Sequence, residues 1–253
     1  MKILVIGAKS PTTWLVFNAI RRRFKSTEIL LEDGVSRGVF FRKRIKSIGI
    51  AKTLGQILFL PVQSMIHWKS RKLIATICEE ASLNLDECRN PLTLNTRSIN
   101  SPTCLKIVKN ISPNLIIING VSILSDETIK SFAVPILNLH CGITPGYRGV
   151  HGGYWALAMG DKENAGVTIH AVDAGIDTGA VLYQKKINYS QTDNICTYPY
   201  RQYSVGIPLM LKAISDFLGE QVCPVEVKMG ESRLWTHPTI FEYLFYRYFR
   251  GVM

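Results

Sequence analysis

The alternation of apolar runs with helix-like segments is the feature that most constrains this chain. Residues 2–7 form an apolar run that ends at Gly7, residues 12–24 predict a helix, and residues 28–32 predict a second strand. The uninterrupted apolar run at residues 115–119 is typical of a strand that is covered on both faces. Strand–helix–strand units join parallel strands through right-handed crossovers. The sequence therefore predicts an α/β fold with a mostly parallel sheet.

The rest of the chain continues this pattern. Further helices are predicted at residues 101–109, 125–132 and 197–218, and further strands at residues 136–140, 166–171 and 180–188. Gly206 and Pro208 weaken the middle of the last helix. Residues 90–102 are polar and rich in turn formers, so we expect a loop there.

Residues 39–82 are predicted to form a helical insertion. Apolar residues recur there at roughly helical spacing with basic residues between them, and Pro61 should divide or kink the run. Basic amphipathic helices can pack on their own sheet, dock on a partner or lie on a membrane surface. We favour packing on the sheet and keep peripheral membrane contact as an alternative.

Residues 224–253 are predicted to form a C-terminal extension. Aromatic and basic residues interleave over residues 237–250. We expect an amphipathic helix that packs on its own domain or on a second subunit, which leaves a homodimer open. Stacking on nucleic-acid bases and contact with a membrane interface are the alternatives.

The net charge is +11, and residues 21–23 and 37–46 carry much of the excess. Such a balance suits anionic partners, namely nucleic acid, a membrane surface or a phosphorylated small molecule, although solvated helix faces would account for it as well. No run of 18 apolar residues free of charge predicts a spanning helix, and the first residues read as a strand and not as a signal peptide. We therefore expect a cytoplasmic protein.

A possible reactive site begins where one predicted strand ends. Asn138 and His140 close the run at residues 136–140 and, two residues apart on a strand, project from the same face. Asp177 follows His140 by thirty-seven residues in a glycine-rich loop. An amide donor, an imidazole and a carboxylate suit acyl transfer to an amine, which needs oxyanion donors and a proton acceptor. A purely structural role is the alternative.

The order of motifs resembles the formyltransferases that use 10-formyltetrahydrofolate. This family includes glycinamide ribonucleotide formyltransferase, methionyl-tRNA formyltransferase and amino-sugar formyltransferases. The motifs are Asn138-Leu-His140, Tyr147-Arg-Gly149, Gly166-Val-Thr-Ile-His170 and Asp177-Thr-Gly179. The similarity is clear from about Leu115 to Gln184 and weaker from Met1 onward. The chain departs from the family at residues 142–145, Gly-Ile-Thr-Pro in place of Ser-Leu-Leu-Pro, and at Asn114, where an aspartate is usual.

The resemblance implies a Rossmann-like, doubly wound catalytic domain over residues 1–223. It implies that Asn138 and a protonated His140 stabilise the formyl oxygen, while Asp177 holds His140 in its charged form and relays a proton. His170 is expected to be structural. Because the chemistry has no covalent enzyme intermediate, Cys141 is not expected to act as a nucleophile.

The resemblance also implies that 10-formyltetrahydrofolate is the formyl donor. Its pterin ring is expected to meet the main chain of two segments, formed by Val121, Ser122, Ile123 and Leu124 and by Asp173, Ala174, Gly175 and Ile176. None of the six cysteines lies in a metal-ligand pattern, so free thiols and no metal are expected.

The acceptor is expected to be a small, anionic amine, most simply a nucleotide-linked amino sugar. Methionyl-tRNA formyltransferase normally carries a further C-terminal β-domain, and no such domain fits after Val222. This argues against methionyl-tRNA and other nucleic acid as the acceptor. The first turn, Ala8-Lys-Ser-Pro11, lacks the phosphate-binding Gly-Ser-Asn type loop of glycinamide ribonucleotide formyltransferase. Two competing functions are formyl hydrolysis, in which water replaces the amine, and non-catalytic binding by a protein that keeps the fold.

Overall fold

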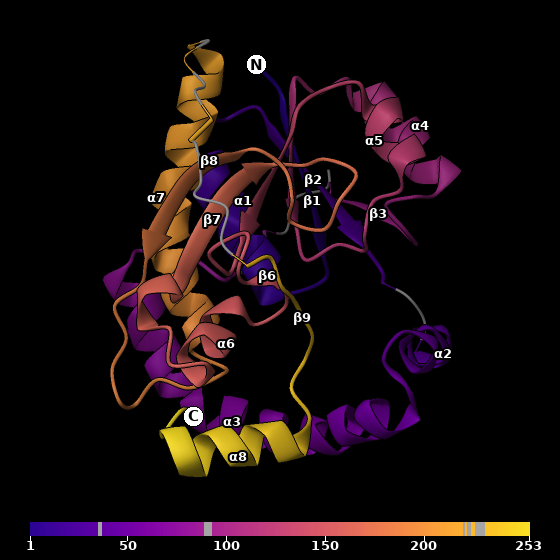
Figure 1. The fold of residues 1–253 in the computed structure, drawn as a ribbon. Helices are drawn as coiled ribbons and strands as arrows, with labels where there is room; N and C mark the ends of the chain where they lie inside the picture. Colours follow the sequence, from indigo (N-terminus) through magenta and orange to yellow (C-terminus); the bar gives the residue numbers. More distant parts are fainter. Residues whose placement is uncertain (35–36, 89–92, 220, 222–223, 226–230) are drawn as a thin grey trace.

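A computed structural model describes residues 1–34, 37–88, 93–219, 221, 224–225 and 231–253. Its central sheet has seven strands in the order β3-β2-β1-β4-β5-β7-β8 (Figure 1). These are β1 (Ile3–Ala8), β2 (Thr27–Glu32), β3 (Leu94–Thr96), β4 (Leu115–Asn119), β5 (Ile136–His140), β7 (Gly166–Ala171) and β8 (Val181–Lys186). The first five are parallel, β7 runs antiparallel to β5, and β8 runs antiparallel to β7. The predicted Rossmann-like, mostly parallel α/β sheet is confirmed.

The helices surround this sheet, and a small second sheet lies beside it. The helices are α1 (Pro11–Arg23), α2 (Arg37–Ile48), α3 (Ile50–Glu80), α4 (Pro102–Ile111), α5 (Asp126–Phe132), α6 (Gly152–Ala158), α7 (Tyr198–Leu218) and α8 (Ile240–Arg250), with a 3₁₀ turn η1 (Lys162–Asn164). The second sheet pairs β6 (Arg148–Gly149) with β9 (Leu234–Trp235).

Local sequence fixes where several helices begin. Ser10 and Ser101 each precede a proline, and each serine side chain accepts a hydrogen bond from the backbone N–H three residues on. Ser125 caps α5 in the same way. A serine cap satisfies one otherwise unpaired N–H, and proline fits the first helical position because it has no N–H to lose.

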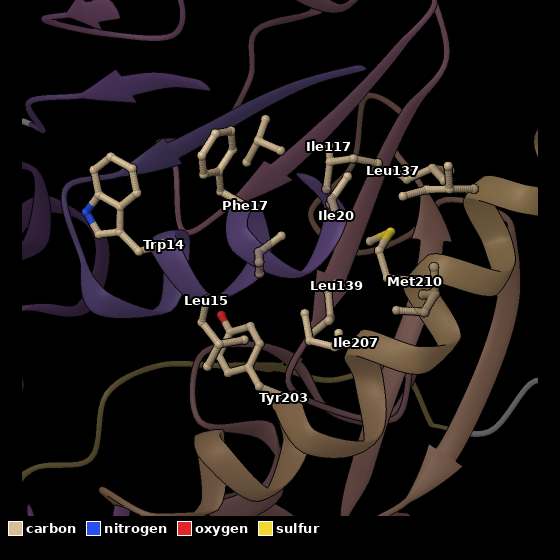
Figure 2. Packing of buried hydrophobic residues seen from close by; sticks show 14 of the residues in the cluster. Trp14, Leu15, Phe17, Ile20, Ile117, Leu137, Leu139, Tyr203, Ile207 and Met210 are labelled. Carbon is tan, nitrogen blue, oxygen red and sulfur yellow. The ribbon is translucent and has the colours of Figure 1, made fainter. Parts of the chain in front are cut away.

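Alternate residues of the central strands enter two different cores. Figure 2 shows Ile117, Leu137 and Leu139 beside Ile207 and Met210 of α7, with α1 completing this layer. The side chains between them on β4 and β5, with the same alternation on β1, pack on the other face under α4 and α5. Because both faces are covered, each strand reads as a nearly continuous apolar run.

The insertion packs onto this frame through α3. Ile74 and Ile77 enter the core that contains α1 and α7, which confirms packing on the chain's own fold. Phe59 lies against Tyr243 of α8, with ring centroids 4.8 Å apart. Of the two outcomes expected at Pro61, a division or a kink, the division does not occur, because α3 continues through it. Tertiary contacts on both sides of Pro61 outweigh the hydrogen bond that proline removes.

Other differences from the sequence-based expectations have simple causes. The expected loop at residues 90–102 contains the edge strand β3, which is too short for a detectable pattern. Helix α6 was not predicted because all seven of its residues are buried, so it shows no polar face. The long helix α7 forms as expected despite Pro208.

The C-terminal helix α8 packs along α3, as expected for a helix docked on its own chain. Residues 90–92 and Cys223, and with Cys223 the boundary proposed between residues 223 and 224, lie outside the described residues, so that boundary stays a prediction. Within the described ranges, no helix is long and apolar enough to cross a membrane.

Candidate functional site

Strand β5 places Asn138 and His140 on one face of the sheet. Leu137 precedes Asn138, and Leu139 lies between Asn138 and His140. Both leucines are buried in the core under α7. That burial fixes the strand's register, because a slip by one residue would exchange its two faces. Asn138 is half-buried, and His140 is only 5% exposed.

Asp177 reaches both of these residues from the loop between β7 and β8. Its Oδ2 lies 3.3 Å from His140 Nδ1, and its Oδ1 accepts from Asn138 Nδ2 at 3.3 Å. Asp177 itself adopts a left-handed backbone conformation with φ +52°. The three residues singled out from the sequence therefore form one cluster.

Three consecutive residues, Tyr147, Arg148 and Gly149, make hydrogen-bonding contacts with this cluster and its loop. The carbonyl of Tyr147 lies 2.6 Å from His140 Nε2, and the N–H of Gly149 donates to Asp177 Oδ2 at 2.8 Å. Arg148 Nη1 donates to the carbonyl of Ile176 at 3.1 Å. Gly149 has φ +91°, and a Cβ there would lie 2.3 Å from the carbonyl oxygen of Trp235, so only glycine fits.

Gly142, one of the departures from the family pattern, belongs to the same arrangement. A Cβ at this position would lie 2.2 Å from the Tyr147 carbonyl oxygen and 2.6 Å from His140 Nε2. The missing side chain therefore lets the carbonyl approach the imidazole. Thr168 Oγ1 donates to the Gly142 carbonyl at 2.7 Å and accepts from Thr144 N at 3.2 Å, which fixes the loop.

His170 is part of the cluster, although the sequence suggested only a structural residue. It is opposite Asn138 in the antiparallel β5–β7 pair. Its Nδ1 lies 2.7 Å from the Ala171 carbonyl, which can only accept, so Nδ1 carries a hydrogen. In the neutral ring Nε2 then accepts from Asn138 Nδ2 at 3.2 Å, and it lies 3.4 Å from Asp177 Oδ1. Strand pairing was the missing signal, since facing residues share one side of a sheet.

Burial and hydrogen bonding set the charges of this cluster. Burial lowers the pKa of His140 more than Asp177 and the Tyr147 carbonyl raise it. Burial alone would raise the pKa of Asp177, but its contacts with His170 and His140 and the N–H of Gly149 lower it below its ordinary value. Burial therefore opposes the protonated His140 that the family resemblance implies, and Asp177 offsets only part of this effect. The protonation state of His140 stays a prediction.

The segment of residues 121–124 follows β4 and is held by its backbone. Glu32 Oε2 accepts from Ser122 N at 2.7 Å, and Asn100 Nδ2 donates to the carbonyl of Ile123 at 2.9 Å. Glu32 also accepts from Ile99 N at 2.8 Å and is 2% exposed. The sequence analysis missed Glu32, whose signal is an acidic residue at the end of a buried strand.

The segment of residues 173–176 begins the loop that carries Asp177. Asp173 Oδ1 accepts from Gly175 N at 3.1 Å and from Thr178 Oγ1 at 2.7 Å, which folds the loop tightly. Val121 and Val172, at the starts of the two segments, pack against the same apolar cluster beneath α4 and α5. The two segments are therefore anchored to the same apolar cluster.

Neither a reactive thiol nor a metal cluster is evident in the part of the chain that the structure describes. Burial raises the pKa of the Cys141 thiol to about 12, and Asp177 adds to this, so the thiol stays protonated. The five cysteines described, which exclude Cys223, are free. Among the described residues no three His, Cys, Asp or Glu side chains are grouped as metal ligands.

Curated relatives align with the middle of the chain. A methionyl-tRNA formyltransferase of Azobacteroides pseudotrichonymphae is 30% identical over 151 residues, which is 58% of this chain and 46% of that protein. A GDP-perosamine N-formyltransferase of Brucella melitensis is 30% identical over 151 residues, or 59% of this chain and 57% of that one. The chain spans about half the length of the curated relatives that it matches.

A solved structure shares the fold more widely. It is a formyltransferase from Anoxybacillus kamchatkensis in complex with UDP-4,6-dideoxy-4-formamido-L-AltNAc and tetrahydrofolate. The TM-score is 0.51 at 17% identity, over 92% of this chain and 84% of that chain. Residues 67–214, more than half of this chain, match the family model described as formyl transferase. The protein belongs to the formyl transferase family.

Proposed function

We propose that this protein transfers a formyl group from 10-formyltetrahydrofolate to the amino group of a small metabolite. The observation that carries the proposal is the convergence of Asn138, His140 and Asp177 at the end of β5, within hydrogen-bonding or ion-pair distance. Membership of the formyl transferase family, which uses formyl-folate, supports it.

Asn138 is proposed to stabilise the oxyanion. The attack of an amine on the formyl carbon moves the carbonyl electrons onto the formyl oxygen, which needs a hydrogen-bond donor. The bonds from Asn138 Nδ2 to His170 and Asp177 are 3.2 and 3.3 Å, at the long end of the normal range. Exchanging one of them for the oxyanion costs little, and a well-placed donor contributes about 3 kcal/mol.

Asp177 is proposed to take the proton that leaves the attacking nitrogen, directly or through a water. Its lowered pKa keeps it ionised and ready to accept. His140 can then share that proton through Nδ1, which faces Asp177, while its Nε2 hydrogen stays on the Tyr147 carbonyl. The pair would hold the proton and then deliver it to the folate nitrogen, which departs with the electrons of its bond to the formyl carbon.

The donor is proposed to lie against the main chain of residues 121–124 and 173–176. A pterin presents donors and acceptors along one edge, which suits peptide groups. Both segments are braced by buried or local carboxylates, Glu32 for one and Asp173 for the other. Such bracing favours a fixed arrangement of peptide groups, which lowers the ordering cost of binding. 10-Formyltetrahydrofolate would supply the formyl carbon.

A nucleotide-linked amino sugar is the proposed acceptor. A hollow of about 530 Å³ lies where β1 and β2 end, and its lining includes Lys9, Ser10 and Trp14. Lys9, which pairs with Asp33, and the N-terminus of α1 would favour a phosphate. A GDP-perosamine N-formyltransferase and a formyltransferase bound to a UDP-sugar are among the similar proteins. Because methionyl-tRNA formyltransferases are similar as well, charged tRNA must be tested beside the sugars.

The test is an incubation of the full chain with 10-formyltetrahydrofolate and a panel of acceptors, with folate absorbance and product mass as readouts. The panel contains nucleotide-linked amino sugars, glycinamide ribonucleotide, methionyl-tRNA and a no-amine control. Formylation of an amino sugar supports the proposal. Preference for glycinamide ribonucleotide or tRNA would overturn the acceptor, turnover without an amine would indicate hydrolysis, and no folate binding would overturn the function.

A further inference from the structure

Exposed apolar side chains concentrate on three helices. Twenty large hydrophobic side chains are exposed among the described residues, and fourteen of them lie on α2, α3 and α8. Figure 1 shows α3 and α8 along one end of the molecule, with α2 beside them. We call the exposed side chains of these three helices the interfacial face. Such a concentration marks a surface that meets another apolar phase.

The apolar residues of α3 form a continuous stripe. Ile50, Leu54, Leu58, Met65 and Trp68 are 50–63% exposed. Their spacing of three, four or seven residues keeps them on one side of the helix. At 1.5 Å per residue the stripe is about 27 Å long. The opposite side of α3 makes its internal contacts, so the fold itself does not require this stripe.

Helix α8 carries a second stripe, which is aromatic. Phe241, Phe245, Tyr248 and Phe249 are 52–77% exposed, whereas Tyr243 on the opposite side is 2% exposed against α3. A groove of about 350 Å³ lies between the two helices, and Met65 and Leu244 are among its lining residues. The groove is therefore lined by Met65 of the α3 stripe and, from α8, by the exposed Leu244.

Basic residues dominate the charge of the same region, although Glu79 and Glu80 end α3 and Glu242 lies on α8. Residues 34–78 contain nine basic residues and no Asp or Glu, out of a net charge of +11 for the chain. The nine are Arg37, Arg42, Lys43, Arg44, Lys46, Lys52, Lys69, Arg71 and Lys72. Lys69 and Arg247 lie at the groove, and the guanidinium of Arg71 stands 5.6 Å from the ring centre of Trp68. Cations therefore flank the apolar stripes.

We propose that the interfacial face docks on the surface of a bilayer that contains anionic phospholipids. Basic residues beside exposed aromatic and aliphatic side chains match phosphate headgroups above acyl chains. RNA would meet the cations but would leave the aliphatic stripe of α3 without a partner. A second copy of the chain would bring the same positive charges together. The protein would lie on the bilayer, because no described helix can span it.

Helix α3 is linked by direct contacts to the cluster of Asn138, His140 and Asp177. Gln56 of α3 donates to the carbonyl of His237, two residues after β9. β9 pairs with β6, and β6 contributes the Gly149 N–H that Asp177 accepts. A short run of direct contacts therefore joins the interfacial face to the site.

The test measures binding of the full chain to vesicles by sedimentation and by tryptophan fluorescence. Vesicles of phosphatidylcholine alone are compared with vesicles that also contain phosphatidylglycerol. Of the four tryptophans only Trp68 is largely exposed, at 58%, so its emission should shift to shorter wavelength on binding. Trp68→Phe should remove the shift while most of the sedimentation remains. Binding should weaken with added salt, as the screening length falls.

Matched variants distinguish docking through the interfacial face from nonspecific adsorption to vesicles. Phe245→Ser with Phe249→Ser should weaken vesicle binding at least about tenfold, since two apolar rings would no longer be buried in the bilayer. Leu218→Ser, at the end of α7, should not. Lys43→Gln with Lys46→Gln should reduce binding to anionic vesicles, whereas Lys106→Gln with Lys109→Gln on α4 should not.

Several outcomes would overturn the proposal. These are no binding to any vesicle, equal binding to neutral and anionic vesicles, and binding that the interfacial variants leave unchanged. Dimers in solution that the phenylalanine variants dissociate, without vesicle binding, would assign the face to a second copy. RNA binding without vesicle binding would assign it to nucleic acid. Because these readouts require no turnover, they stay independent of the proposed formyl transfer.

Discussion

The polar cluster of Asn138, His140 and Asp177 and the interfacial face are opposites in how they use side chains. At the end of β5, polar groups of Asn138, His140 and Asp177 are largely buried and bonded to one another. On α3 and α8, apolar groups such as Trp68 and Phe249 are exposed by 58% and 75%. Each region places residues where folding alone would not, since buried polar groups and exposed apolar groups both cost stability.

The difference shows two ways in which a fold can carry function. The cluster is built by the fold, because strand pairing, a turn and backbone peptide groups each contribute a hydrogen bond to it. The fold does not need the interfacial face, because the buried sides of α3 and α8 already make the internal contacts. Substitutions should therefore affect activity in the first region and association in the second.

The largest effect is expected at Asp177. Asp177→Asn keeps the shape but removes the ionised acceptor, so turnover should fall at least about a hundredfold, the range for general-base catalysis. Steady-state kinetics with the preferred acceptor would measure this. Asp126→Asn, at the exposed start of α5, is the control and should leave turnover within about twofold of the parent. A folded Asp177→Asn enzyme with normal turnover would exclude Asp177 as the base.

Neighbours on β5 should separate chemistry from stability. Asn138→Ala should lower turnover by up to about a hundredfold through the lost oxyanion donor, with only about 1 kcal/mol lost in unfolding free energy. Leu139→Ala empties a site under α7 and should cost about 3 kcal/mol of unfolding free energy. Urea denaturation and kinetics on both variants test this. Equal destabilisation of the two would mean that Asn138 is mainly structural.

A smaller, pH-dependent effect is expected from His151 and His237, whose ring nitrogens lie 3.0 Å apart between the two regions. Burial, assisted by His237, lowers the pKa of His151 to about 3, and burial, assisted by Arg44, lowers that of His237 to about 4. Both folded-state pKa values lie below the unfolded value of about 6.5. The unfolded state therefore gains protons first, and stability present above about pH 6.5 is lost as the pH falls toward 4.

The size of this loss should be about 1.4 kcal/mol per pH unit for each histidine. Urea denaturation at several pH values would measure it. His237→Asn should reduce the slope of the unfolding free energy against pH by the contribution of about one histidine. His67→Gln, on the exposed side of α3, should leave the slope unchanged. A parent protein equally stable at pH 7 and pH 5 would show that these rings are not held neutral.

The smallest effect is expected on the outer side of α8. Phe249→Ser should change the free energy of unfolding by less than about 0.5 kcal/mol, because the ring is 75% exposed. Tyr243→Ala on the inner side of the same helix should cost about 3–5 kcal/mol, since its ring is buried against Phe59. Thermal unfolding of both variants would test this. A large loss from Phe249→Ser would show that the outer side belongs to the fold.

Local patterns in the sequence were sufficient for most of the frame. The apolar runs at residues 3–8 and 115–119 and the serine caps at Ser10 and Ser101 act over a few residues, so their consequences appear in the sequence itself. The same is true of the shared face of Asn138 and His140, because a strand alternates its faces with a period of two.

Only the tertiary structure decided how the site is completed and charged. The Tyr147 carbonyl and the Gly149 N–H are backbone groups, so the residue types in the sequence do not reveal their role. His170 joins through the pairing of β7 with β5, and Glu32 through a buried contact with a distant turn. The lowered pKa of His140 depends on its burial, which is a property of the assembled fold. Sequence alone therefore determined which groups could react, and packing decided their partners and the directions of their pKa shifts.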